Sequence, residues 1–164
     1  VLPRDYVKQQ EIELVLSEMA EQVAIRLRAI RKKTTTVSIS IGYSRFEEST
    51  SFRGQMKIEP TNQTEELQKY VISLFRKKYN GGAVRSISVF YSSFVDENIT
   101  MLSLFDDPEE ILKKERLQTA IDAIRSQFGF TTLQKANSLT SASRSIARSK
   151  LVGGHSAGGL DGLK

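Results

Sequence analysis

The sequence predicts an α+β fold with the element order βαββαβ, that is, a four-stranded antiparallel sheet with two helices on one face. Two stretches carry apolar residues at helical spacing, and three stretches alternate apolar and polar residues with a period of two. With 164 residues, of which 39% are hydrophobic, the chain is long enough for one such domain followed by a C-terminal helix and a flexible tail.

The first strand and the first helix are expected within the first thirty or so residues. Residues 1–6 have the pattern of the end of a strand, so we expect a longer chain to precede Val1. In residues 9–31, apolar side chains recur at steps of three and four and form one helical face. These side chains are Ile12, Val15, Met19, Val23, Leu27 and Ile30.

The two middle strands are predicted to pair as a hairpin with a long loop. The first of these strands is predicted at residues 34–44. From residue 37 on, β-branched or aromatic side chains at odd positions alternate with serine or glycine at even positions. Residues 52–59 alternate in the same way. This period of two is typical of strands that are buried on one face only.

The second helix is predicted to follow Pro60 and to end at the two glycines 81–82. Asn62 is predicted to cap it, with Glu65 three residues later as in a capping box. The last strand, residues 84–91, repeats the alternation with its serines on the same face as those of the earlier strand.

The sheet face without helices is predicted to bind phosphates. Hydroxyls, an amide and basic groups lie on it, and these groups make phosphate contacts together with backbone N–H groups. The candidate residues are Ser38, Ser40, Arg45, Arg53, Gln55, Lys57, Arg85, Ser86 and Ser88. An ordinary solvated face accounts for the same pattern, because antiparallel sheets commonly face water on one side.

The basic charge is unevenly distributed. Residues 1–107 hold 15 Lys or Arg and 14 Asp or Glu, whereas residues 108–164 hold 9 and 5, so most of the net charge of +5 lies in the C-terminal part. Composition also shifts there toward Ser, Gly and Ala. The predicted divisions are a domain at 1–95, a linker at 96–109, and a C-terminal helix with a basic tail at 110–164.

Several classes of site are not expected. The chain has no cysteine, and its single histidine, His155, lies in a glycine-rich stretch, which argues against disulfides, thiolate metal sites and histidine clusters. No acidic pair has the strand context of a metal-dependent active site, so no catalytic residue and no metal ligand is predicted. Without a signal peptide or a long apolar stretch, we expect a cytoplasmic protein with no membrane partner.

The chain resembles the little finger of Y-family translesion DNA polymerases, of the UmuC-type ImpB/MucB/SamB group found in Gram-positive bacteria. The resemblance lies in an ordered series of segments: LPRDY, VAIRLRAIRKKTTTVSISIGYSRF and QTEELQKYVISLFRKKYNGGAVRSISV. It covers about residues 1–95, and the tail ending in ARSKLVGGHSAGG is similar to the C-terminal end of that group.

This resemblance implies a DNA-binding role in the SOS response and DNA damage tolerance. The little finger lays its open sheet face along the major groove and holds phosphates of the damaged template-primer duplex without reading its sequence. The palm domain, with its Mg²⁺ ions and carboxylates, would lie N-terminal to Val1. We therefore expect no cofactor and no polymerase activity in this chain alone, and a DNA-directed DNA polymerase, a nucleotidyltransferase, as its parent.

A short apolar segment resembles the sliding-clamp-binding pentapeptide, Gln-Leu-Ser/Asp-Leu-Phe, which UmuC-type polymerases carry at this place. Its residues are Met101, Leu102, Ser103, Leu104 and Phe105. Met101 stands where Gln is usual, which removes polar contacts at the edge of the clamp pocket. Packing of the same segment against its own domain is the alternative.

The C-terminal part is predicted to contain an amphipathic helix that ends near Phe128, and the resemblance implies a UmuD-like subunit or the recombinase filament as its partner. For the basic segment 138–150, a solvated tail is favoured over contact with DNA phosphates.

Two other functions stay open for the whole chain. One is a stand-alone nucleic-acid-binding module, such as an RNA binder, although serines take the place of stacking aromatics. The other is a regulatory ferredoxin-like domain.

Overall fold

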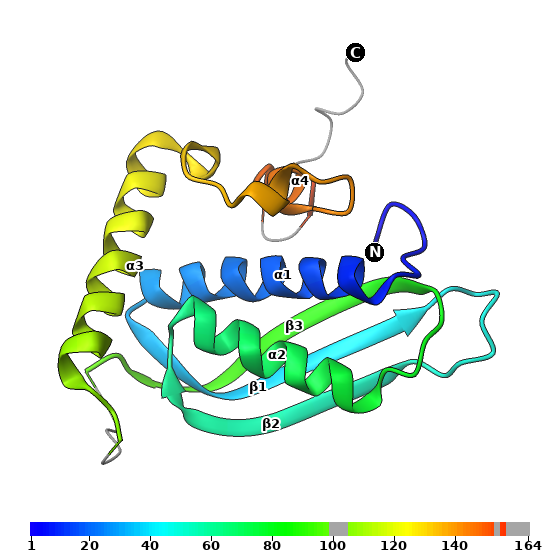
Figure 1. Ribbon diagram of the computed structural model, residues 1–164, viewed down its shortest axis with the longest axis horizontal. Helices are drawn as coiled ribbons and strands as arrows, with labels where there is room; N and C mark the ends of the chain where they lie inside the picture. Colours follow the sequence, from blue (N-terminus) through cyan, green and yellow to red (C-terminus); the bar gives the residue numbers. More distant parts are fainter. Residues whose placement is uncertain (99–104, 153–154, 157–164) are drawn as a thin grey trace.

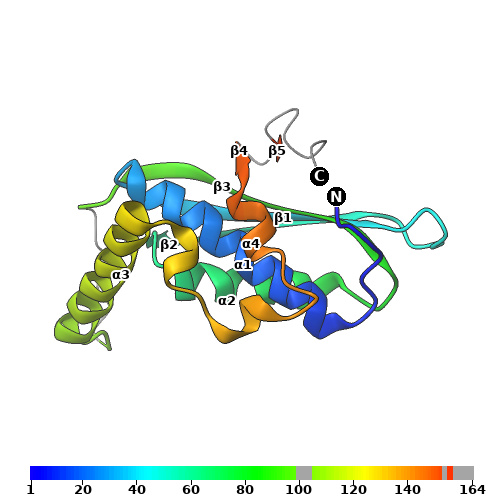
Figure 2. The same cartoon turned by 90° about the horizontal axis from the view of Figure 1, so that it is seen from above.

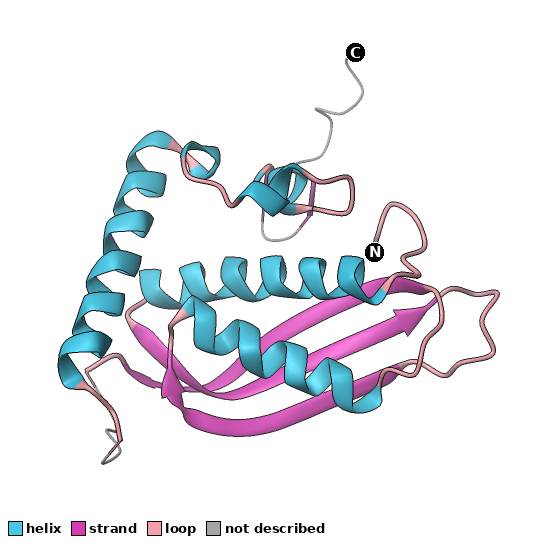
Figure 3. Cartoon of the chain, in the orientation of Figure 1, coloured by secondary structure: helices cyan, strands magenta, loops and turns pink. Residues whose placement is uncertain are grey.

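The helices and strands follow the predicted order. The structure, a computed structural model, describes residues 1–98, 105–152 and 155–156. Figure 1 labels the elements along the chain, and Figure 3 distinguishes helices from strands. They are α1 (Gln9–Ala29), β1 (Lys32–Tyr43), β2 (Phe52–Thr61), α2 (Thr64–Lys78), β3 (Val84–Asp96), α3 (Pro108–Phe128), two 3-10 turns (Phe130–Thr132 and Ala136–Leu139), α4 (Ser145–Ser149), β4 (Leu151–Val152) and β5 (His155–Ser156).

The main sheet is antiparallel, with the strand order β2-β1-β3. Helices α1 and α2 pack side by side, and Figure 2 shows both of them on the same side of this sheet. The α+β class and the two-helix layer are therefore confirmed.

The predicted first strand is reduced to one bridge. Tyr6 and Val84 exchange two backbone hydrogen bonds, of 2.9 and 2.8 Å, and the N–H of Leu2 donates to the carbonyl of Arg85 at 2.8 Å. Pro3 has no N–H to donate, and the chain bends at this point, so no longer ladder forms. The described main sheet accordingly has three strands with this segment beside β3.

The hydrophobic core lies between the sheet and the two helices. Alternate residues of β1 point into it, and one stripe of each helix meets them. Its fully buried members, each at most 1% exposed, include Ile12, Leu16, Val37, Ile39, Ile41, Leu67, Val71, Phe75 and Val84. Because successive strand residues face opposite sides, this burial directs the serines of β1 away from the helices.

The predicted Asn62 cap of the second helix is wrong. The first residue before α2 is Gln63, whose side chain caps nothing, and the backbone N–H of Gln63 bonds to Thr61 Oγ1 at 3.1 Å. Asn62 Nδ2 instead donates to the carbonyl of Lys32 at 3.1 Å, at the start of β1. A tertiary contact therefore uses the side chain that local sequence assigned to the cap.

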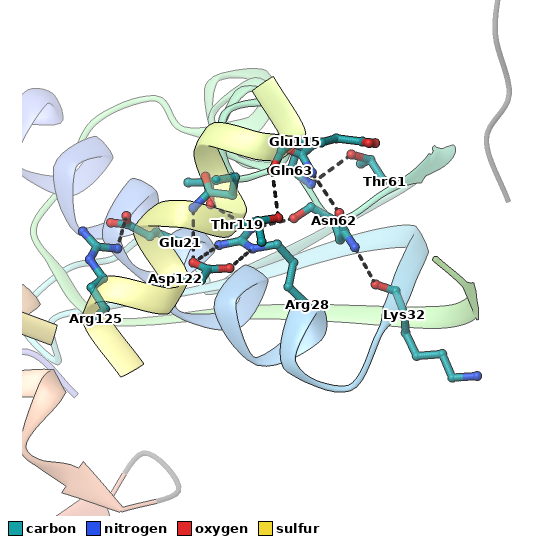
Figure 4. A network of polar contacts seen from close by, with 12 residues as sticks. Glu21, Arg28, Lys32, Thr61, Asn62, Gln63, Glu115, Thr119, Asp122 and Arg125 are labelled. Carbon is teal, nitrogen blue, oxygen red and sulfur yellow. Dashed lines mark hydrogen bonds and ion pairs between the residues drawn. The ribbon is translucent and has the colours of Figure 1, made fainter. Parts of the chain in front are cut away.

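Helix α3 is held to the domain by two ion pairs, which Figure 4 shows from close by. Arg28 of α1 reaches both carboxylate oxygens of Asp122, at 2.6 and 3.1 Å. Arg125 Nη1 lies 2.9 Å from Glu21 Oε1, and both of these side chains are about nine-tenths buried. No apolar residue of α3 is buried, so charge rather than apolar packing sets its position.

Residues 129–150 fold back along α1, which corrects the expectation of a flexible tail for this stretch. Tyr6 Oη donates to the carbonyl of Ala142 at 2.8 Å. Glu18 accepts from the backbone N–H of Arg144 at 2.8 Å. In Figure 1 this segment and α4 lie across α1 from α2. The small side chains that suggested flexibility permit close packing, and buried polar side chains of α1 and the N-terminus satisfy the backbone.

Candidate nucleic-acid interface

The register of the sheet brings seven of the nine candidate residues together on the face opposite the helices. Read from β2 through β1 to β3, three successive rows join Lys57 with Thr36 and Ser92, Gln55 with Ser38 and Phe90, and Arg53 with Ser40 and Ser88. In the next row Ser86 lies opposite Gly42. We call the residues of these four rows the sheet-face surface.

Charge and hydroxyl groups are arranged in bands across this surface. The long polar side chains of Arg53, Gln55 and Lys57 are exposed along β2, which is an edge strand of the described sheet. Beside them, Ser38 and Ser40 of β1 and Ser86 and Ser88 of β3 are only half-exposed, whereas Ser92 is exposed. Cations at one edge and short hydroxyls in the middle leave room for a rod-like polyanion to lie close to the strands.

Gly42 contributes by having no side chain. A Cβ atom built on it would lie 2.2 Å from Ser86 Oγ, well inside van der Waals contact. The hydroxyl of Ser86 therefore occupies the space that any larger residue at this position would need. The glycine keeps this end of the sheet-face surface flat.

Two candidate residues, Arg45 and Arg85, lie outside the rows. Arg45 is in the loop between β1 and β2, where its guanidinium stands 5.0 Å from the ring centre of Phe46. Arg85 follows the register shift at the start of β3 and lies 3.4 Å from Asp5 Oδ1 of the N-terminal segment.

Strand β3 runs five residues beyond its predicted end and adds Phe94 to the aromatic Phe90 of the predicted strand. Phe90 is 57% exposed and Phe94 is 49% exposed. Two consecutive serines hid this extension, and one of them, Ser93, has a φ of 55°, in the left-handed region. The aromatic and β-branched pair Phe94–Val95 after these serines was the signal that sequence reasoning missed.

The clamp-binding segment falls mainly outside the described residues. Met101, Leu102, Ser103 and Leu104 all lie there. Phe105 is described, and its side chain is 97% exposed immediately before α3.

No group of three or more His, Cys, Asp or Glu side chains that could hold a metal ion occurs within residues 1–98, 105–152 and 155–156. Across the same part of the chain, no helix has the length and apolarity needed to cross a bilayer.

Comparisons with known proteins give one family match and several similar proteins. Residues 1–104 match the family model described as the impB/mucB/samB family C-terminal domain. The chain is 38% identical over 156 residues to the "Putative UV-damage repair protein UvrX" of Bacillus subtilis (strain 168), a match that covers 94% of this chain and 37% of that protein. It is 37% identical over 156 residues to "DNA polymerase IV 2" of the same organism and 34% identical over 155 residues to "DNA polymerase IV 2" of Halalkalibacterium halodurans, each with the same coverage. The chain thus spans little more than a third of the length of these relatives.

Proposed function

Since the chain belongs to the impB/mucB/samB family, whose C-terminal domain it contains, we propose that it is the DNA-binding domain of an error-prone translesion polymerase. It grips the template-primer duplex with the sheet-face surface. Nucleotide transfer and its Mg²⁺ ions belong to a palm domain of the longer protein. Primer extension by this chain alone should give no product, and metal-dependent incorporation would overturn that division of labour.

The convergence of candidate residues in the sheet register is the observation that carries this proposal. Residues separated by about fifty positions in the sequence, such as Ser38 and Ser88, come into adjacent rows with basic residues at one edge. Hydroxyls and flexible cations contact phosphate oxygens without distinguishing bases. Such contacts suit a protein that must hold damaged template, because altered bases leave the phosphate spacing nearly unchanged.

Duplex binding at several salt concentrations tests the proposal. Each phosphate contact contributes about 0.9 to the slope of log K against log salt. Arg53→Gln and Lys57→Gln should each lower the slope by about 1 in fluorescence anisotropy. Lys69→Gln, which removes the same charge from the exposed side of α2, is the matched control and should bind as the unmodified chain does. Absence of any duplex binding would favour the regulatory ferredoxin-like alternative.

Competition with single-stranded RNA separates the proposal from an RNA-binding module. The exposed Phe90 and Phe94 are the observation that favours this second candidate, because aromatic side chains on an open sheet face can stack on unpaired bases. If duplex binding is the function, RNA should compete weakly and Phe90→Ala should affect RNA and duplex binding to the same small extent. Loss of RNA binding alone would favour the module.

We also propose that Met101–Phe105 tethers the protein to the sliding clamp. The full exposure of Phe105 supports this, because a large apolar side chain beside a polar linker is suited to a hydrophobic pocket on a partner. The double change of Leu104 and Phe105 to Ala should abolish clamp pull-down. Met101→Gln should strengthen it, and unchanged binding in both variants would refute the tether.

We propose α3 as the surface for a protein partner, either a UmuD-like subunit or the recombinase filament. Leu112 and Leu117 are 49% and 62% exposed, although both are apolar. Leu117→Arg should weaken capture by the true partner and leave duplex binding unchanged. If Leu117→Arg captures each candidate partner as well as the unmodified chain does, α3 is excluded as the partner surface.

A further inference from the structure

The contact between α1 and α4 gathers arginines around one carboxylate. Glu18 of α1 accepts a hydrogen bond from Ser143 Oγ and another from the backbone N–H of Arg144, which fixes the start of α4. One turn later the N–H of Arg148 donates to the carbonyl of Arg144 at 2.8 Å. Because α4 packs against α1, both arginines lie beside this helix.

The α1 side of this contact adds two further hydrogen-bond donors. Glu18, Gln22 and Arg26 follow one another at intervals of four residues, so they lie on one face of the helix. Burial lowers the pKa of Arg148 most, and the positive charge of Arg26 lowers it further; Glu18 opposes this shift, and Arg144 adds to it. We call Gln22, Arg26, Arg144 and Arg148 the α1–α4 cluster.

The α1–α4 cluster lacks acceptors for its buried donors. Gln22 Nε2 and Arg148 Nε are both buried without a hydrogen-bond partner among the described residues. Leaving such a group unsatisfied costs about 1–3 kcal/mol, and folded proteins rarely do so. Both oxygens of Glu18 already accept bonds from Ser143 and Arg144. The Glu18 carboxylate is therefore the one negative charge described beside the three guanidinium groups of the cluster. Two buried donors, Gln22 Nε2 and Arg148 Nε, have no acceptor among the described residues.

A phosphate group would supply what is missing. It carries negative charge and several strong acceptor oxygens, and the planar fork of an arginine matches its geometry. Figure 1 places α4 across α1 from α2, and in Figure 2 its continuation, β4, extends toward the sheet side that α2 does not cover. Helix α4, which contains Arg148, thus lies beyond the β3 side of the sheet, where a polyanion that continues past that edge would run.

We propose that the α1–α4 cluster is a phosphate-binding site and that its ligand is a backbone phosphate of the duplex held by the sheet-face surface. The identity of the ligand rests on the proposed function, whereas the phosphate chemistry of the site does not. The free phosphate ion is the other source of the same group. The experiment therefore has two arms.

The first arm measures duplex binding by fluorescence anisotropy over a range of salt concentrations. Arg148→Gln should lower the salt slope by about 1 and the affinity by roughly five- to tenfold near 0.1 M salt. Arg116→Gln removes the same charge from an exposed position on α3 and is the matched control. It should bind as the unmodified chain does.

The second arm measures thermal unfolding in inorganic phosphate and in chloride at equal ionic strength. Phosphate should raise the melting temperature of the unmodified chain and of Arg116→Gln, but not that of Arg148→Gln. In chloride, Arg148→Gln should melt at the same or a higher temperature, because burial and the charges of Arg26 and Arg144 disfavour the Arg148 guanidinium more than Glu18 favours it. A lower melting temperature in chloride would show that Arg148 is already satisfied within the chain and would overturn the proposal.

The combined outcomes separate this proposal from the proposed function. If Arg148→Gln changes neither the salt slope nor the phosphate effect while Arg53→Gln lowers the slope, the α1–α4 site is refuted and the sheet-face surface stands. If Arg53→Gln has no effect and Arg148→Gln abolishes the phosphate effect, the site stands with free phosphate as its ligand. Loss in both arms supports a duplex phosphate.

Discussion

Replacing Asp122 with asparagine should release α3 without unfolding the sheet domain. The carboxylate of Asp122 receives two N–H groups of Arg28, and the two side chains are 23% and 9% exposed. Because no apolar residue of α3 is buried, the two ion pairs to α1 are the main described contacts that position it. The expected effect is therefore local.

The magnitude follows from the exposure of the pair. Exposed ion pairs contribute roughly 0.2–1 kcal/mol, and breaking a buried one costs about 3–5 kcal/mol. Here water reaches the carboxylate, and Arg28 keeps the carbonyl of Asn62 at 2.7 Å as another acceptor. We expect a loss of about 2 kcal/mol, between those limits, which corresponds to a roughly thirtyfold larger population with α3 undocked.

Hydrogen exchange read by mass spectrometry measures this population peptide by peptide. Protection should fall in residues 108–128 and stay unchanged in β1 and β3. Asp96→Asn, which makes the same chemical change in the exposed Lys32–Asp96 pair, should have almost no effect. Unchanged protection of α3 in Asp122→Asn, or loss of protection across the whole sheet, would refute the reasoning.

Three further changes test the packing of the domain. The side-chain hydrogen bond from Arg76 holds the pKa of Glu13 below its ordinary value. The Arg76–Glu13 pair therefore stabilises the fold above the unfolded-state pKa of Glu13, and this contribution is lost as pH falls. Arg76→Gln should lower the urea midpoint of unfolding at neutral pH, and the difference from the unmodified chain should shrink toward about pH 3. Gly82→Ala should lower the melting temperature by a cost on the order of 1–2 kcal/mol, because Gly82 has a φ of 102° and a Cβ there would lie 3.2 Å from the ring of Tyr43. Phe75→Ala should cost about 3–5 kcal/mol in urea unfolding, because its side chain is fully buried. For each variant, a urea midpoint or melting temperature equal to that of the unmodified chain would contradict the expectation.

Sequence alone was sufficient to predict the buried and exposed faces of strands whose side chains alternate regularly. The period-two pattern around Val37, Ile39 and Ile41 predicted which face of β1 is buried, because burial on one side forces the alternation. The same pattern in β2 and β3 placed the serines and basic residues on the opposite face. The rows of the sheet-face surface then followed from strand pairing, although the pattern itself does not encode the register.

Contacts that join distant segments were not predictable from local patterns. Asn62 precedes a helix and has the side chain of a cap, yet it bonds to the start of β1, thirty residues earlier. Arg85 belonged to the candidate surface by its charge, but the register shift beside Gly42 and Tyr43 carries it to Asp5. In both cases, a contact with a residue distant in sequence determines which hydrogen bond or ion pair the side chain makes.

The buried glutamates of α1 show the same limit most clearly. By sequence, Glu18 and Glu21 belong to the acidic half of a helix whose dipole favours them. In the structure they are 6% and 8% exposed and hold the C-terminal segment and α3. Nothing in the helical period distinguishes a carboxylate that faces water from one that a later segment covers.

Burial raises the pKa of Glu18, despite the opposing hydrogen bonds from Ser143 and Arg144. A carboxyl group with a raised folded-state pKa stabilises the fold below its unfolded pKa, and this contribution is lost as pH rises through the folded pKa. Docking of residues 129–150 should therefore weaken from mildly acidic to neutral pH.

Glu18→Gln should remove this pH dependence and keep the contact. The amide oxygen can accept from the N–H of Arg144, and the amide nitrogen can donate to Ser143 Oγ, so both bonds persist without a charge to desolvate. Limited proteolysis within residues 129–150 should accelerate with pH in the unmodified chain, relative to cleavage of an unstructured peptide, and should be level in the variant. The same acceleration in both proteins would show that Glu18 does not control docking.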